Sequence, residues 1–117
     1  MSSQEDLELM HALAFFYWRR NQKERAAPLA YAAYRLGNHD IKLVSLLALT
    51  LLDLNLPDRS LAVLEDVDNQ DDPDMQRSIC SIRARALLRL GYVERAQAEF
   101  RRGLYPDNET TVGSAVA

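Results

Sequence analysis

Small residues recur along the chain at a nearly fixed interval, and this repeat constrains the fold more than any other feature. Two sets show intervals of 34 and then 36 residues: Ala14, Ala48 and Ala84, and Ala26, Ser60 and Ala96. Large apolar residues flank both sets at i, i+3, i+4 and i+7, the spacing of one helix face. A small residue at each point allows two helices to approach closely. The pattern predicts a helical hairpin that occurs three times.

Turn signals divide the 117 residues into six helical segments, which predicts a single all-α domain over 1–117. The predicted helices are 4–20, 24–36, 40–54, 58–67, 73–90 and 93–104. Pro57 and Pro73 stand where a first helical residue is expected, and Asp72 can cap the helix that starts at Pro73. Pro28 lies about one turn inside its helix, so we expect it to delay or bend that helix.

The third repeat carries a recognisable motif: LGYVERA over 90–96, then Phe100 and Pro106. With the 34-residue period, this motif resembles the tetratricopeptide repeat. The resemblance implies three hairpins, approximately 7–38, 41–73 and 75–108, in a short right-handed solenoid with a concave groove. The chain end at 109–117 is expected to be a disordered tail. The chain departs from the pattern at Asn21 and Asn55, where glycine is usual, and at Arg83, where an apolar residue is usual.

In such a solenoid the first helix of each hairpin forms the concave face. The predicted partner-binding residues are His11, Phe15, Trp18, Arg19, Lys42, Ser45, Leu46, Leu49, Leu52, Ile82, Arg85, Leu88 and Arg89. The same register puts on this face Glu8, Ala12, Asp53, Ser78 and Ser81.

The centre of this predicted surface is apolar, and its rim is basic at Arg19, Arg85 and Arg89. A contiguous exposed apolar patch marks an interaction site, which an amphipathic or extended apolar segment would fill. The alternative is a register shifted by one position, in which these residues only pack the hairpins together. Some relatives in the tetratricopeptide family bind a chaperone's C-terminal carboxylate through Lys, Asn and Arg. Only Arg85 could serve that role here.

Composition and charge exclude several classes of protein. Cys80 is the only cysteine, so an internal disulfide is excluded, and we expect a cytoplasmic protein. The first residues lack a signal peptide, and Lys42 and Asp53 interrupt the longest apolar stretch, so no membrane span is expected. A net charge of −3 argues against nucleic acid as the main partner, although the first hairpin has a basic end.

No cofactor is expected. His11 and His39 have no His or Cys partner at helical spacing, so neither predicts a metal site. The acidic run over 65–74 resembles a calcium loop, but Asp71 stands where glycine is required and Arg77 where glutamate is required. A buried Cys80 would be inert. No convergent polar site is evident, and we therefore expect no enzyme.

Size and layout resemble the small tetratricopeptide chaperones of bacterial type III secretion systems, of the YscY type or the YscG type. That resemblance implies a cytoplasmic chaperone that holds a small helical secretion protein, either a YscX-like exported component or a needle subunit. Three repeats without a cap would expose core at one end, so self-association is expected when the partner is absent. The alternative is a general scaffold for protein–protein interaction that is not tied to secretion.

Overall fold

A computed structural model describes residues 3–104, and these residues form six α-helices. The helices are α1 (Gln4–Arg19), α2 (Lys23–Arg35), α3 (Ile41–Asp53), α4 (Pro57–Leu64), α5 (Pro73–Arg89) and α6 (Val93–Leu104). All six predicted helices are present, with bounds that differ from the predictions by at most three residues. The predicted tail at 109–117 and Pro106 lie outside the described residues.

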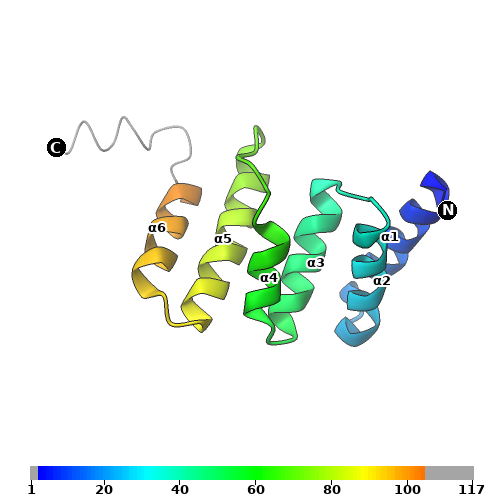
Figure 1. Cartoon of the computed structure of the whole chain (residues 1–117), viewed down its shortest axis with the longest axis horizontal. Coiled ribbons are helices and arrows are strands. Elements are labelled where there is room, and N and C mark those ends of the chain that lie inside the picture. The colour runs from blue at the N-terminus through cyan, green and yellow to red at the C-terminus, as the bar shows by residue number, and fades with distance from the viewer. Residues whose placement is uncertain (1–2, 105–117) are drawn as a thin grey trace.

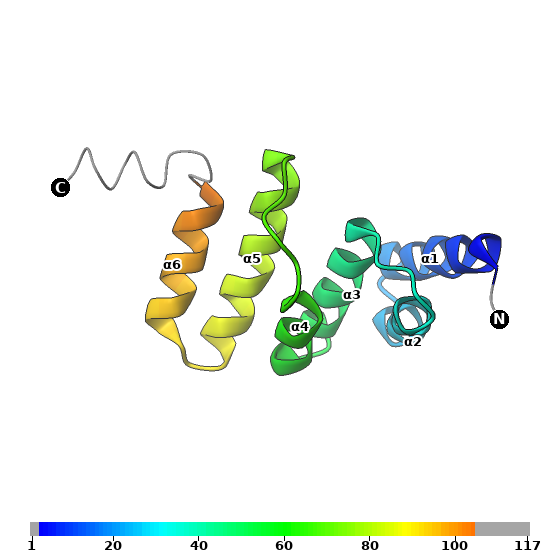
Figure 2. The same ribbon diagram turned by 45° about the horizontal axis from the view of Figure 1, so that its top comes forward.

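The helices follow one another along the long axis of a molecule that measures 53 × 28 × 23 Å (Figure 1). Three helical hairpins pair α1 with α2, α3 with α4 and α5 with α6, and the first helix of a hairpin also packs on both helices of the preceding hairpin. Both views show α1 and α6 at opposite ends (Figure 2). Each hairpin therefore has one face toward the N-terminal end of the row and one toward the C-terminal end.

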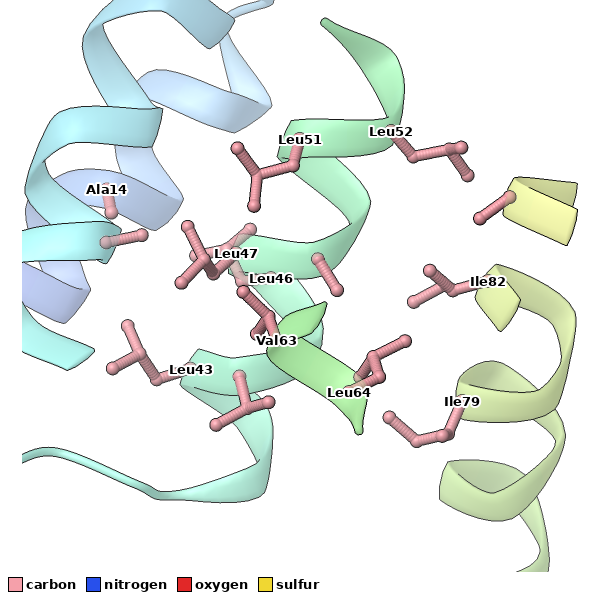
Figure 3. Packing of buried hydrophobic residues seen from close by; sticks show 14 of the residues in the cluster. Ala14, Leu43, Leu46, Leu47, Leu51, Leu52, Val63, Leu64, Ile79 and Ile82 are labelled. Atoms are coloured by element: carbon pink, nitrogen blue, oxygen red, sulfur yellow. The ribbon is translucent and has the colours of Figure 1, made fainter. Parts of the chain in front are cut away.

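The core is centred on α3, which is apolar nearly all round. Leu43 and Leu47 are fully buried on the side of the first hairpin (Figure 3). Leu52, also fully buried, extends with Leu64 of α4 toward α5, which carries Ile79 (Figure 3). Burying one such side chain stabilises the fold by roughly 1.5–3 kcal/mol. Because α3 buries side chains against both neighbours, it joins the outer hairpins into one unit.

The turns within the three hairpins are alike, although their sequences differ. Asn21, Asn55 and Gly91 occupy equivalent positions and all have a positive φ, of 61°, 63° and 89°. At each turn the next N–H donates to the carbonyl of the residue five positions earlier, at 2.9 Å. This is the Schellman arrangement, which requires the left-handed conformation. Asparagine tolerates that conformation better than other non-glycine residues, which explains the two departures from glycine.

Proline and aspartate set the helix starts largely as the sequence predicts. Asp72 Oδ1 accepts from the N–H of Asp74 at 3.0 Å, and Pro57 and Pro73 are first helical residues. Pro28 lies inside α2, which already begins at Lys23, so this proline does not delay the start of the helix. The largest difference in bounds is at α4, which ends at Leu64 rather than at residue 67.

Arg83 explains where α4 ends. Its Nη2 donates to the carbonyl oxygens of Leu64 and Val67, at 2.7 and 2.8 Å. Carbonyl groups at the end of a helix have no partner within the helix and carry partial negative charge, which a cation complements. The arginine at a usually apolar position thus links α5 to the end of α4.

Gly103 sets the distance between the last two helices. A Cβ built at this position would lie 2.7 Å from the Cβ of Cys80, closer than real Cβ atoms approach. Gly103 is buried, and α5 and α6 form the most extensive helix pair. Only glycine permits this close approach without a shift of α6.

We predict that Gly103→Ala lowers the free energy of unfolding by about 1–3 kcal/mol, because the added methyl group forces α6 away from α5. Chemical denaturation followed by circular dichroism measures the change. Ala98→Gly is the matched control, since Ala98 is an exposed residue of the same helix. Its cost should be only the helix propensity of glycine, about 1 kcal/mol. A Gly103→Ala protein as stable as the original would contradict the close contact.

Arg83→Met should also destabilise the fold, by about 1–3 kcal/mol, because it removes the guanidinium donor to the carbonyl groups of Leu64 and Val67. The control is Arg85→Met, two positions away on the exposed side of α5, which should change stability by less than about 0.5 kcal/mol. Equal midpoints for the two variants in urea denaturation would argue against the linking role of Arg83.

Candidate functional site

A groove runs across the first helices of the three hairpins. It has a volume of about 500 Å³ and draws its walls from α1, α3 and α5. The lining residues are Glu8, His11, Ala12, Phe15, Trp18, Lys42, Ser45, Leu46, Leu49, Ser78 and Ile82. All of these lie on the face that the repeat register puts on the concave side. The groove is open, so a segment from another protein has access to it.

Exposure differs between the walls and the floor of this groove. Leu46 and Ile82 are buried, so they form the floor and also belong to the core. Leu49 is half-buried, and Phe15 is exposed. Apolar side chains therefore reach from the core to the surface without a polar layer between them. This arrangement suits an apolar face of a helix, because its side chains would continue the packing of the core.

The α1 wall of the groove is aromatic. Phe15 and Trp18 stack with ring centroids 6.1 Å apart, and the guanidinium carbon of Arg19 lies 5.8 Å from the Phe15 centroid. Within the described residues, the buried Trp18 Nε1 has no hydrogen-bond partner. Trp18 is the only tryptophan of the chain, so its fluorescence reports on this wall alone.

Polar side chains also line the groove. Glu8 and Lys42 are exposed, and His11 and Ser45 are half-buried. Ser45 Oγ donates to the carbonyl of Lys42 at 3.0 Å, so its donor is used within α3. The groove thus offers one acidic and one basic side chain to a partner, beside the apolar side chains of α1, α3 and α5.

Leu52 and Arg89, both predicted as groove residues, do not line this groove. Leu52 is fully buried between the second and third hairpins, because α3 is covered on that side by α5. Arg89 Nη1 donates to the carbonyl oxygen of Leu52, the residue before the last of α3. Both residues hold the hairpins together. This is the role that the alternative with a shifted register gives to the predicted groove residues.

Arg85 and Leu88 lie elsewhere too. They line a second hollow, of about 600 Å³, between α5 and α6. Arg19 is exposed but does not line the groove. The three arginines expected at one rim are therefore not brought together there. Pattern alone missed this because α5 has no hairpin after it among the described residues, so its concave side merges with an uncovered end.

No match to known proteins is found: no family model, no curated protein and no solved structure is significantly similar to the chain.

Among the described residues, no group of three or more His, Cys, Asp or Glu side chains could hold a metal ion. Over the same part of the chain, no helix is long and apolar enough to cross a bilayer.

The acidic segment 65–72 is tied to α5 through Gln76, whose Oε1 accepts from the N–H of Gln70 at 2.7 Å. This contact gives that segment a structural role.

Cys80 lies in the core between α5 and α6 and away from the groove. Burial raises the pKa of its thiol, and a hydrogen bond from Arg102 opposes that shift in part. Thiolate is the reactive form, so burial and the raised pKa both slow its reaction.

We predict that iodoacetamide modifies Cys80 far more slowly in the folded protein than in denaturant at the same pH. Mass spectrometry of timed samples measures the ratio. Because the fold favours the protonated thiol, this group's contribution to stability is present below the ordinary pKa of the thiol and is lost as pH rises through the raised value. Equal alkylation rates in the two states would contradict the burial of Cys80.

Proposed function

We propose that the chain is a cytoplasmic chaperone of a bacterial type III secretion system, and that it holds an apolar or amphipathic helix of a small exported component until export. In this proposal the three hairpins are tetratricopeptide-like repeats of a short right-handed solenoid. The observation that carries it is the open groove across α1, α3 and α5, with Phe15, Trp18 and Leu49 on its walls.

The chemistry of the groove favours a helix over a charged peptide. Its lining contains one acidic and one basic residue, too few to fix a peptide by charge. Apolar side chains at i, i+3 or i+4 and i+7 of a partner helix would lie along Leu46, Leu49 and Ile82. Displacement of water from these side chains supplies the free energy of binding.

The assignment to secretion rests on the resemblance in size and layout, and the partner proposed is a YscX-like component or a needle subunit. The general scaffold is the second candidate, because an open apolar groove serves any partner helix. The two candidates differ in the range of partners. A dedicated chaperone forms a stable 1:1 complex with one small exported protein, whereas a scaffold binds several unrelated ones.

The test is co-expression with each small helical exported subunit of the secretion system in the same cell. Gel filtration with light scattering gives the stoichiometry, and Trp18 fluorescence gives the affinity. We expect a 1:1 complex with one subunit and a blue shift of the emission as water leaves the α1 wall. If none of these subunits forms a complex, the proposed role in secretion is wrong.

Leu49→Glu and Phe15→Glu should each weaken this complex by about tenfold or more, because a carboxylate would be buried against an apolar helix without a partner. Both side chains reach solvent, so the variants should fold, which circular dichroism checks. Leu36→Glu is the matched control: Leu36 is exposed at the end of α2, outside the groove, and its variant should bind as the original does. Groove variants that fold and keep full affinity would show that the partner lies elsewhere.

A further inference from the structure

The two ends of the row of hairpins each expose a set of apolar side chains. At the C-terminal face, the hollow between α5 and α6 is lined by Leu88, Val93 and Phe100, with Leu88 57% and Phe100 52% exposed. At the N-terminal face, α1 exposes Leu9 and Phe16, by 58% and 49%. The sequence predicts uncovered core at one end, whereas the described residues leave both ends uncovered.

The repeat register shows what the C-terminal face is built to receive. Leu88 and Phe100 each follow a fully buried residue of the second hairpin, Leu52 and Leu64, by 36 residues. Leu52 and Leu64 are buried because the first helix of the next hairpin, α5, packs on them (Figure 3). The C-terminal face thus repeats a surface that, inside the molecule, receives a first helix.

The N-terminal face is the complementary half of the same interface. Leu9 and Leu13 precede Leu43 and Leu47 by 34 residues, and both of those leucines of α3 are fully buried on the side of the first hairpin (Figure 3). Leu13 is 38% exposed, although the apolar spacing around Ala14 predicts a core residue at this position. Its exposure follows from the absence of a preceding hairpin among the described residues.

We infer that α1 of a second copy of this chain docks on the C-terminal face, so that copies associate head to tail and reproduce the packing found between hairpins. The contact is heterologous: each copy offers one face and receives the other. It is independent of the proposed partner groove, since Leu46 and Leu49 lie on neither end face.

Charge supports this pairing. A short connection makes α3 run antiparallel to α2, so α1 of the second copy would run antiparallel to α6. That direction brings Glu5 and Asp6, in the first turn of α1, toward Arg101 in the last turn of α6. It also brings Arg20 at the end of α1 toward Glu94 in the first turn of α6. Opposite charges therefore meet at both ends of the contact.

One internal hydrogen bond has a counterpart in the docked pair. Arg89 Nη1 donates to the carbonyl of Leu52 across the interface between the second and third hairpins. In the register, Arg19 is equivalent to Arg89 and Leu88 to Leu52. The exposed Arg19 of the second copy would thus reach the Leu88 carbonyl. This contact gives a role to Arg19, which does not line the groove.

The test uses two variants that each damage one face. Leu13→Glu removes the N-terminal face and Leu88→Glu the C-terminal face, and sedimentation velocity measures association. The original protein should show a concentration-dependent series of monomer, dimer and larger species. Each variant alone should associate at least about tenfold more weakly. Mixed in equal amounts, the two variants should form a 1:1 heterodimer, because one intact face of each kind remains.

That recovery on mixing separates head-to-tail docking from any symmetric dimer, in which two damaged copies cannot restore each other. Phe16→Glu is the second N-terminal variant, should Leu13→Glu fail to fold. Leu36→Glu, on neither end face, should associate as the original does, and so should the groove variant Leu49→Glu. A monomeric original protein at all concentrations, as when a segment of its own chain covers the face, would overturn the inference. A mixture that remains monomeric would do so too.

Discussion

The packing of α3 between the hairpins on either side is the interaction on which the rest of the structure depends. Leu43 and Leu47 are buried on the side of α3 that faces the first hairpin, and Leu52 is buried on the side that faces the third. Without these contacts the first and third hairpins have no common core. The Ser60 hydroxyl, which donates to the Ala48 carbonyl at 2.7 Å, fixes the close approach of α4 to the same helix. The groove follows from this packing, since it opens along the one strip of α3 that no other helix covers.

Much of the fold could be predicted from the sequence because most helix ends have a local cause. Proline and aspartate mark the starts, and Asn21, Asn55 and Gly91 supply the left-handed residue that ends a first helix. The end of α4 could not be predicted in this way. It depends on Arg83, which lies 19 residues from Leu64 in sequence and acts through a contact between helices.

Only part of the groove lining could be predicted from the sequence, because of the composition of α3. Its side chains are apolar nearly all round, so the pattern does not separate the strip facing solvent from the sides facing other helices. Leu49 lies on the strip, whereas Leu52 lies on the covered side. Arg85 and Leu88 follow the pattern of a concave face but border the hollow at the end of the row. The sequence does contain a signal for this second surface. In the repeat register, Leu88 and Phe100 are equivalent to the buried Leu52 and Leu64.

The proposed partner lies along the first helices of the three hairpins. Hydrogen–deuterium exchange of the free protein and of its complex with the bound secretion subunit tests it most directly. We predict slower exchange on binding in α1, α3 and α5, over residues 8–18, 42–49 and 78–82, with little change in α2, α4 and α6. Protection concentrated in α2, α4 and α6 would contradict the claim, because the partner would then cover the opposite side of the hairpins.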